Sequence, residues 1–483
     1  MRKRFLCFLT VFLFVVGLAR AQSLKDDPRV AAALKLIEVW VEAQLAYEHI
    51  PGMSLGIVHD QDLVWSRGFG YANLEKKIPA SPSTIYSICS ISKLFTSIGV
   101  MQLRDQGKLR LDDPVGKHLS WFNIKDAFPE APEITLSGIL THSSGLPRES
   151  DYPYWTGPEH CFPTREQIIE KLSAQEELYP ADTYFQYSNL GLTLAGEVVA
   201  AVSGQPYADY AKQHILDLLG LKDTSPEIPA EHRGGRLAIP YGKRMRDGSR
   251  KIIPFYLVRG VAPAAGFAST IEDLARFASW QFRLLEKGGK EVLAANTLKE
   301  MHRVHWVDQD WETKWGLGFS VWRHKEKTFV GHSGGCPGYR TRLSICPQDK
   351  IAIVVMTNAN DVSPSPYARQ VYDIAAPAII KALESPGQGK KGDEDLEKFV
   401  GRYDRPLSRE MYVLIMDGEL AVISLPTDNP LDSLTKLKRV GENIFRRVRD
   451  DGNLGEEVVF ELGPDGKVTC LIWHSNYAYR VDS

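Results

Sequence analysis

The stretch at residues 87–107, SICSISKLFTSIGVMQLRDQG, decides which fold the sequence predicts. Apolar residues recur in it at helical spacing until Gln106 and Gly107, so the stretch reads as a helix. Ser90 stands at the start of this helix, where free backbone N–H groups and the positive end of the helix dipole favour a developing negative charge. Lys93 lies one turn further along, so its side chain returns along the same face toward Ser90.

This pair of residues predicts a nucleophile with its base. A serine needs a base beside it at neutral pH, and a partly desolvated lysine can take that role. The alternative is a serine that caps the helix and a lysine that lies in solvent. The same S-x-x-K spacing recurs at Ser433 and Lys436, where neighbouring charged residues favour the structural interpretation.

On either side of this helix the sequence predicts strands. Residues 53–70 and 339–358 each read as two strands joined by a short polar turn. Between them lie helical patterns and long loops, without the alternation of strand and helix that builds a parallel sheet. We therefore expect an α/β (α+β) fold: an antiparallel sheet assembled from both ends of the domain and flanked by helices, with a helical subdomain inserted between.

A second, smaller module follows the main domain, which we expect to span residues 22–384. The segment at residues 385–398 combines Pro, Gly and dense charge, which is typical of a linker. Residues 399–483 alternate apolar and polar residues and contain three Asp-Gly turns. This pattern predicts a small all-β domain, either a barrel or a meander.

The first 21 residues have the order of a secretory signal peptide: a basic start, an apolar run and a cleavage site of small residues. The apolar run is short for a membrane span, which needs about 20 residues, so an uncleaved anchor is the less favoured alternative. We expect a secreted or periplasmic protein. Cleavage would remove four basic residues and take the formal net charge from −2 to −6, and an acidic chain has no electrostatic case for binding nucleic acid.

The cysteine pattern argues against a disulfide framework and a zinc site. After cleavage five cysteines are left, an odd number at scattered spacings. Neither C-x-x-C nor H-E-x-x-H occurs in the chain. We expect no metal and no cofactor, and we expect Cys89, next to Ser90, to be a small buried apolar residue.

A second helical pattern begins after Tyr187 and Ser188 and ends at Gly204. Tyr187 therefore stands at a helix entrance, with Asn189 in the first turn. A cation such as Lys93 close to the phenol would lower the pKa of Tyr187 and let it transfer protons. A packed tyrosine beside a capping asparagine is the alternative if Tyr187 is considered alone.

The segment GHSGG at residues 331–335 matches G-x-S-x-G, the nucleophile pattern of many lipases and esterases. A serine of that kind lies between a strand and a helix, but Ser333 is followed by Cys336, Pro337 and a pattern typical of a β-hairpin. We therefore expect that Ser333 is not the attacking group. The alternative is an α/β-hydrolase in which Ser333 acts with a later Asp and with His474.

The order of these motifs resembles that of the serine β-lactamase and penicillin-binding-protein superfamily. SISK at residues 90–93, YSN at 187–189 and HSG at 332–334 follow one another, accompanied by PGMSLGIV, ILTHSSGLP and AGFASTIEDLARFA. The resemblance covers roughly residues 30–380. It is strongest to class C β-lactamases, D-aminopeptidases and related serine hydrolases and esterases. The C-terminal module resembles, more weakly, the small barrel of some D-aminopeptidase-like members.

The resemblance implies a role for each of these positions. Ser90 would be acylated, Lys93 would be its base or proton relay, and Tyr187 would be the general base or acid. The substrate-binding residues would be Asn189, His332, Ser333, Gly334 and Gly335. The backbone N–H groups of Ser90 and Gly335 would form the oxyanion hole.

One position departs from the β-lactamase pattern. His332 occupies the place where β-lactamases usually have a lysine that holds a substrate carboxylate, and a histidine is mostly neutral near pH 7. This favours ester or peptide-like substrates over efficient β-lactam hydrolysis. Arg340 and Arg342 could replace the carboxylate contact, although a solvated strand face is the favoured interpretation for both.

The sequence therefore predicts a secreted serine hydrolase that forms an acyl-enzyme with a small ester, peptide or amide, D-amino-acid and β-lactam compounds included. The alternatives are an esterase that uses Ser333, and a non-catalytic penicillin-binding or sensor module that is acylated without turnover. No pattern in the sequence indicates an oligomeric state, and a membrane would be contacted only through an uncleaved signal sequence.

Overall fold

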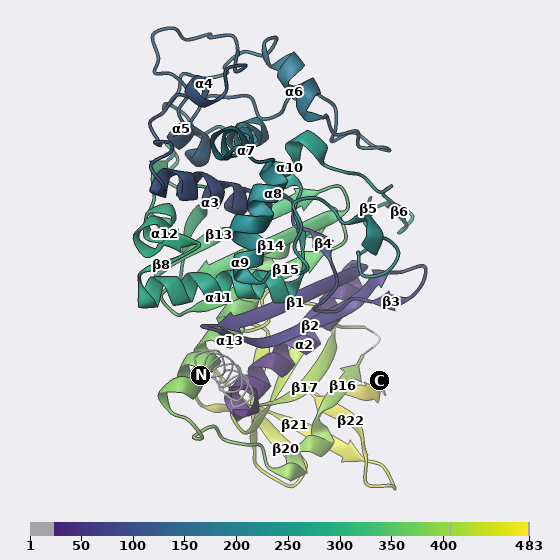
Figure 1. Ribbon diagram of the computed structural model, residues 1–483. Coiled ribbons are helices and arrows are strands. Elements are labelled where there is room, and N and C mark those ends of the chain that lie inside the picture. Colours follow the sequence, from purple (N-terminus) through teal and green to yellow (C-terminus); the bar gives the residue numbers. More distant parts are fainter. Residues whose placement is uncertain (1–23, 406, 482–483) are drawn as a thin grey trace, which may run out of the picture. The chain divides into compact units, whose positions relative to one another are not determined.

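The computed structural model describes residues 24–405 and 407–481, so the signal peptide predicted at residues 1–21 lies outside the described part (Figure 1). The chain divides into two compact units. The sheet unit comprises residues 51–368, and the barrel unit comprises residues 369–481 together with the described residues up to Ile50. Among the described helices, none is both long and apolar enough to cross a membrane.

The sheet unit is built on a nine-stranded antiparallel sheet with the order β10-β11-β12-β13-β14-β15-β1-β2-β3. Its strands are β1 (Gly52–His59), β2 (Asp62–Asn73), β3 (Ile78–Pro79), β10 (Trp306–Val307), β11 (Lys314–Trp315), β12 (Ser320–His324), β13 (Lys327–Cys336), β14 (Tyr339–Cys346) and β15 (Ile351–Thr357). β1, from the start of the unit, pairs with β15, from its end, so that Met53 lies opposite Thr357. This pairing confirms the predicted antiparallel sheet assembled from both ends of the domain.

The chain between β3 and β10 forms the inserted helical region. Its helices are η1 (Cys89–Ile91), α3 (Ser92–Asp105), α4 (Val115–His118), α5 (Leu136–Thr141), α6 (Arg165–Leu172), α7 (Asn189–Ser203), α8 (Tyr207–Ala211), η2 (Lys212–Leu216), α9 (Asp217–Leu219), η3 (Ala230–His232), η4 (Arg259–Val261), α10 (Ala262–Ala265), α11 (Ile271–Lys287) and α12 (Ala295–His302). Short strand pairs join β4 (Tyr86–Ser87) to β7 (Ala268–Ser269), β5 (Tyr241–Arg244) to β6 (Arg250–Ile252), and β8 (Lys290–Glu291) to β9 (Leu293–Ala294). Helix α11 packs on β1 and β15, where Gly56 admits the Ile271 side chain (Figure 1).

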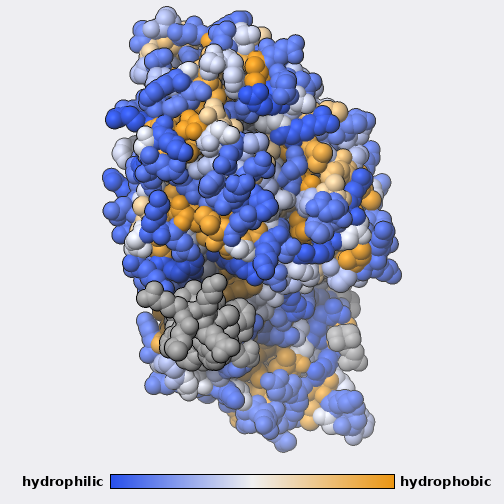
Figure 2. Space-filling view, viewed as in Figure 1, coloured by the Kyte–Doolittle hydropathy of each residue, from blue (hydrophilic) through white to orange (hydrophobic). Residues whose placement is uncertain are grey.

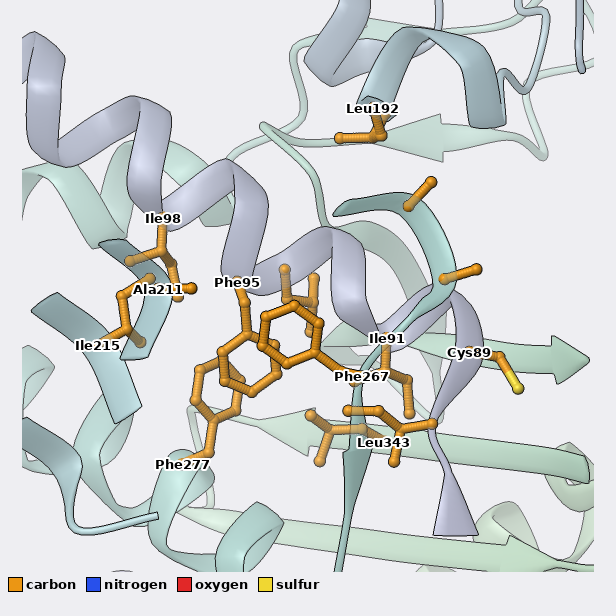
Figure 3. Packing of buried hydrophobic residues seen from close by; sticks show 14 of the residues in the cluster. Cys89, Ile91, Phe95, Ile98, Leu192, Ala211, Ile215, Phe267, Phe277 and Leu343 are labelled. Carbon is orange, nitrogen blue, oxygen red and sulfur yellow. The ribbon is translucent and has the colours of Figure 1, made fainter. Parts of the chain in front are cut away.

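Helix α3 lies in the middle of the main hydrophobic core (Figure 3). Every residue of α3 from Ser92 to Leu103 is buried. The ring of Phe95 lies 4.8 Å, between centroids, from both Phe267 and Phe277. Burying one such ring stabilises the fold by about 1.5–3 kcal/mol, so α3 is held firmly on the side facing these rings. Lys93, the one charged residue in this buried stretch, is therefore removed from water.

The barrel unit contains helix α2 (Pro28–Glu48), most of α13 (Pro364–Glu384) and the 3₁₀ helix η5 (Glu394–Phe399). Its eight strands close into a barrel: β16 (Gly401–Asp404), β17 (Glu410–Met416), β18 (Glu419–Leu425), β19 (Leu434–Arg439), β20 (Ile444–Val448), β21 (Leu454–Leu462), β22 (Val468–Trp473) and β23 (Asn476–Val481). Of the two predicted forms, the barrel is therefore the correct one. The grouping of α2 with the barrel has no signal in the sequence, and the predicted domain boundaries at residues 384 and 399 stay predictions.

The barrel has a core of its own. Phe460 lies 4.7 Å from Phe399 and 5.5 Å from Phe445, measured between ring centroids, and all three rings are buried. At the surface, hydrophilic residues cover most of the visible face of each unit, and apolar residues form small scattered patches (Figure 2). Scattered apolar residues of this kind are ordinary on a folded protein.

Candidate active site

Ser90 lies in the 3₁₀ turn η1, directly ahead of helix α3. The sequence placed it at the start of the α-helix itself; the structure begins that helix two residues later, at Ser92. Cys89, directly before Ser90, has a φ of +52°, in the left-handed region, which costs a non-glycine residue about 1–2 kcal/mol. Strained backbone of this kind is found most often at functional sites. Here it turns the chain so that Ser90 is partly exposed and lines a cavity.

Lys93 is fully buried, and its ammonium group is aimed at Ser90. Its Nζ lies 3.2 Å from Ser90 Oγ, 2.7 Å from Asn189 Oδ1 and 2.8 Å from the carbonyl oxygen of Ala264. Three acceptors surround the nitrogen, so its position is well defined. Burial lowers the pKa of Lys93 from its ordinary value near 10.5 to about 7, because the charged form loses its hydration. A substantial fraction of Lys93 is thus neutral, and able to accept a proton, at neutral pH.

Tyr187 lies just ahead of α7, and the structure brings it to the same serine. Its phenol interacts with the Ser90 hydroxyl, and the cations of Lys93 and Arg148 each lie 4.9 Å from the centre of its ring. The expected lowering of its pKa is wrong: burial raises the pKa of Tyr187 above its ordinary value of 10, and the hydrogen bond to Ser90 offsets only part of this. The phenol is therefore protonated at neutral pH and acts as a donor.

Asn189 is buried, and both ends of its carboxamide are occupied. Oδ1 accepts from Lys93, while Nδ2 lies 2.9 and 3.1 Å from the two carboxylate oxygens of Glu149. In this structure the side chain of Asn189 thus supports Lys93, whereas the sequence predicted a contact with substrate. The sequence did not predict Glu149 as a site residue, because it lies in a loop after α5 and belongs to no recognisable motif.

Strand β13 forms the facing wall of the site. A Cβ on Gly334 would lie 2.2 Å from the carbonyl oxygen of Ile88, so only a glycine lets β13 lie this close to the turn before Ser90. Gly335, the next residue, lines the same cavity as Ser90. Ser333 lies in the middle of β13, opposite Arg342 of β14, and no helix follows it. The alternative of an α/β-hydrolase nucleophile at Ser333 is therefore wrong.

His332 is buried beside the catalytic candidates and is neutral. Its Nδ1 lies 2.5 Å from the carbonyl oxygen of Ser333, and because a carbonyl only accepts, Nδ1 carries the proton. Nε2, an acceptor in this tautomer, is buried without a hydrogen-bond partner among the described residues. Burial, with the nearby Lys93 charge, lowers the pKa of His332 from 6.5 to about 3. His332 therefore brings no positive charge to the position that a lysine occupies in β-lactamases.

A cavity of about 550 Å³ opens in front of Ser90. Its aromatic wall is made of residues that the sequence analysis did not single out: Phe185, Trp315 and Trp322. Arg340 also lines the cavity, with its Nε bound to the carbonyl oxygen of Asn360. Arg342 lies instead over the Trp322 ring, 3.9 Å from its centre. The site therefore combines an aromatic wall with charged side chains, among them the guanidinium groups of Arg148 and Arg340.

His142 belongs to the same aromatic cluster. Its ring lies 4.3 Å from that of Tyr187 and 5.0 Å from that of Trp315, and its Nδ1 accepts from the backbone N–H of Ser188. Burial holds the pKa of His142 well below its ordinary value. It therefore supports the position of Tyr187 as a neutral residue.

No three His, Cys, Asp or Glu side chains of the described residues form a group that could hold a metal ion. Among the described residues, the cysteines at positions 89, 161, 336, 346 and 470 form no disulfide bond. Cys89 is fully buried, as predicted.

Comparison with known proteins identifies the family of the chain. The family model "Beta-lactamase" matches residues 37–376. Beta-lactamase-like protein 2 of Dictyostelium discoideum is 26% identical over 371 residues, which make up 75% of this chain and 66% of that protein. The chain thus spans just under two thirds of the length of this curated relative.

Solved structures show the same fold. The octameric penicillin-binding protein homologue from Pyrococcus abyssi has a TM-score of 0.63 and 26% identity, covering 92% of this chain and 99% of that one. The D-amino acid amidase from Ochrobactrum anthropi has a TM-score of 0.58 and 22% identity, covering 73% of this chain and 98% of that one. The chain belongs to the β-lactamase family and has the fold of its serine hydrolases.

Proposed function

We propose that this protein is a serine hydrolase that works through an acyl-enzyme on Ser90, with small esters, peptides or amides as substrates. The observation that carries the proposal is the buried Lys93, whose Nζ lies 3.2 Å from Ser90 Oγ and whose pKa is lowered to about 7. A lysine of this kind is a base matched to neutral pH. The cavity in front of Ser90 supplies the place for the substrate.

Acylation follows from these positions. Ser90 Oγ attacks the substrate carbonyl carbon while its proton passes to neutral Lys93, and the carbonyl oxygen becomes an oxyanion. The backbone N–H groups of Ser90 and Gly335 stabilise that charge. The bond to the leaving oxygen or nitrogen then breaks, and the leaving group takes a proton from the Tyr187 phenol, which is replenished from the Lys93 ammonium.

Deacylation repeats these steps with water in place of Ser90. Neutral Lys93 accepts a proton as water attacks the acyl carbon, and Ser90 Oγ recovers a proton when it leaves. Because the pKa of Tyr187 is raised, the phenol is a proton donor in both halves, and the basic role belongs to Lys93.

Next to the scissile bond, at the place of the β-lactamase lysine, the cavity offers no positive charge for a substrate carboxylate; the cations among its described lining residues are Arg148, Lys314 and Arg340. His332 is neutral, whereas a β-lactamase lysine at this place would bind such a carboxylate. The aromatic wall of Phe185, Trp315 and Trp322 suits an apolar acyl or amino-acid side chain. The similarity to a D-amino acid amidase supports including D-amino-acid amides among the substrates. The basic and apolar leader supports export to the periplasm or beyond.

The test is to label the protein with a fluorophosphonate and to locate the adduct by mass spectrometry. The adduct is expected on Ser90, and Ser90→Ala should hydrolyse p-nitrophenyl esters at least about 1000-fold more slowly than the parent. Ser433→Ala is the matched control, since Ser433 has the same S-x-x-K spacing but lies in the barrel unit. An adduct on Ser333, or full activity in Ser90→Ala, would refute the proposal.

A substrate panel then separates the finer alternatives. Short esters, D-amino-acid amides and nitrocefin would be compared by kcat/KM, and we expect the first two classes to exceed nitrocefin. A burst of one acylation per protein without steady turnover on every substrate would instead identify a non-catalytic binding or sensor module.

A further inference from the structure

Glu149 does not line the cavity and reaches the active site from behind, through its contact with Asn189. Its two carboxylate oxygens lie 2.9 and 3.1 Å from Asn189 Nδ2, and Tyr154 donates its phenol hydrogen to the same carboxylate. Asn189 in turn accepts from Lys93 through Oδ1, at 2.7 Å. A chain of hydrogen bonds therefore runs from Tyr154 through Glu149 and Asn189 to Lys93.

The chemistry of this chain fixes how the Asn189 carboxamide is turned. A carboxylate only accepts hydrogen bonds, so the NH₂ end of Asn189 must face Glu149. That leaves the carbonyl end for Lys93, whose ammonium group only donates. Without Glu149 only the contact with Lys93 would favour that orientation, and a rotated carboxamide would set its NH₂ group against the ammonium.

Glu149 also contributes charge. The charged and titratable groups that face Lys93 come from several elements: Arg148 and Glu149 after α5, His142 at the end of α5, Cys89 in η1, His332 and Cys336 in β13, and Tyr187 before α7. Glu149 is the only carboxylate among these groups. Its side chain is 21% exposed, so its attraction for Lys93 is screened less than that of a surface charge. The same carboxylate also forms an ion pair with the more exposed Arg148, whose Nε lies 3.2 Å from Oε1.

We propose that Glu149 is a positioning residue of this active site: it orients Asn189 toward Lys93 and supplies the counter-charge for the Lys93 ammonium. This rests on the proposed function, because it assigns to Glu149 the setting of the base that activates Ser90. With Glu149 in place, Lys93 is protonated at slightly acidic pH and loses its proton near neutral pH. Asn189 transmits the effect, and Glu149 itself never contacts the reacting atoms.

Two substitutions separate the charge of Glu149 from its orienting role. Glu149→Gln removes the charge but keeps an oxygen that accepts from Asn189, so Lys93 loses its proton more readily. The midpoint of the rise in Ser90 labelling with pH should then move down by about one pH unit, with the plateau rate within about threefold of the parent. Glu149→Ala also releases Asn189, so the midpoint should move down and the plateau rate should fall at least about tenfold.

Glu170→Gln is the matched control, since Glu170 is an exposed residue of α6 and its replacement makes the same change in net charge. It should leave both the midpoint and the plateau as in the parent. A midpoint in Glu149→Gln equal to that of Glu170→Gln would overturn the proposal, as would an upward movement.

Failure of this proposal is distinguishable from failure of the proposed function. If the parent is not labelled on Ser90 at any pH, the hydrolase proposal fails. The effect of Glu149 on the ionisation of Lys93 can still be measured without any labelling of Ser90. In protein labelled with ¹³Cε-lysine, the Lys93 resonance, assigned with Lys93→Arg, reports its ionisation by NMR. A Lys93 midpoint that is about one pH unit lower in Glu149→Gln supports the proposal, and an unchanged midpoint overturns it.

Discussion

At the scale of single residues, the site separates three nitrogen bases that could each titrate near neutral pH. Lys93, His142 and His332 lie within one cluster, and burial lowers the pKa of all three. The two histidines start from about 6.5 and are held well below the neutral range, whereas Lys93 starts from about 10.5 and arrives at about 7. Burial therefore keeps both histidines neutral near pH 7, whereas it brings the pKa of Lys93 close to neutral pH, where the lysine can accept a proton.

This separation predicts a pH profile with one assignable midpoint. Only the neutral form of Lys93 accepts the Ser90 proton, so the rate of Ser90 labelling should rise with pH through about 7 and level off above it. Lys93→Arg stays charged at every accessible pH, so its labelling rate should fall at least about 100-fold and lose this rise. Stopped-flow or quenched labelling from pH 5 to 10 measures both.

The histidines provide the control for that profile. His332→Gln removes a group that is already neutral across this range, so the midpoint should stay where it is in the parent, whatever happens to the rate. If the labelling rate no longer rose with pH in His332→Gln but still did so in Lys93→Arg, the base would be His332, which would contradict the role of Lys93.

At the scale of secondary structure, the site depends on how closely strand β13 approaches the turn η1. Gly334 allows that approach, because a Cβ there would lie 2.2 Å from Ile88 O and 2.2 Å from Thr341 Oγ1. The first of these is a backbone atom, so it cannot rotate away. Because Gly334 has no side chain, β13 can lie close enough to η1 to bring the backbone N–H groups of Ser90 and Gly335 to the same site.

Gly334→Ala should consequently push β13 away from η1 and spoil the oxyanion hole. We expect the labelling rate of Ser90 to fall about 100-fold, which is typical for the loss of one oxyanion donor, with about 1–3 kcal/mol of stability lost. Gly116→Ala in α4 is the control, since a Cβ there meets only one ring atom, at 3.9 Å. Equal labelling rates in the two variants would show that β13 does not shape the site.

The elements also show which parts of the site a sequence reveals. The strands at residues 53–70 and 339–358 and the helix after Ser90 have regular apolar patterns, and all of them form as predicted. The turn at Cys89 does not follow from local preference, because its left-handed φ is imposed by the surrounding fold. Glu149 and Trp315 reach the site from a loop and a two-residue strand, and no periodic pattern marks either.

At the scale of the whole molecule, the sheet unit and the barrel unit each contain a hydrophobic core among their described residues. Every residue that lines the cavity belongs to the sheet unit, whose main core packs around α3. The barrel unit is stabilised by its own cluster of buried side chains, among them Phe399, Phe445 and Phe460. Independent cores imply that the barrel can be weakened without changing the geometry around Ser90.

A pair of phenylalanine substitutions tests this independence. Phe460→Ala in the barrel and Phe277→Ala beneath α3 each empty a buried site, at a cost of about 3–5 kcal/mol to the unit concerned. In calorimetry the two variants should lower different unfolding transitions. In Phe460→Ala, Ser90 should be labelled at the parent rate at 25 °C. In Phe277→Ala it should be labelled more slowly, because looser packing of α3 makes the position of Lys93 less well defined. If Phe460→Ala slowed labelling as much as Phe277→Ala, the barrel would have to be counted among the elements that shape the active site.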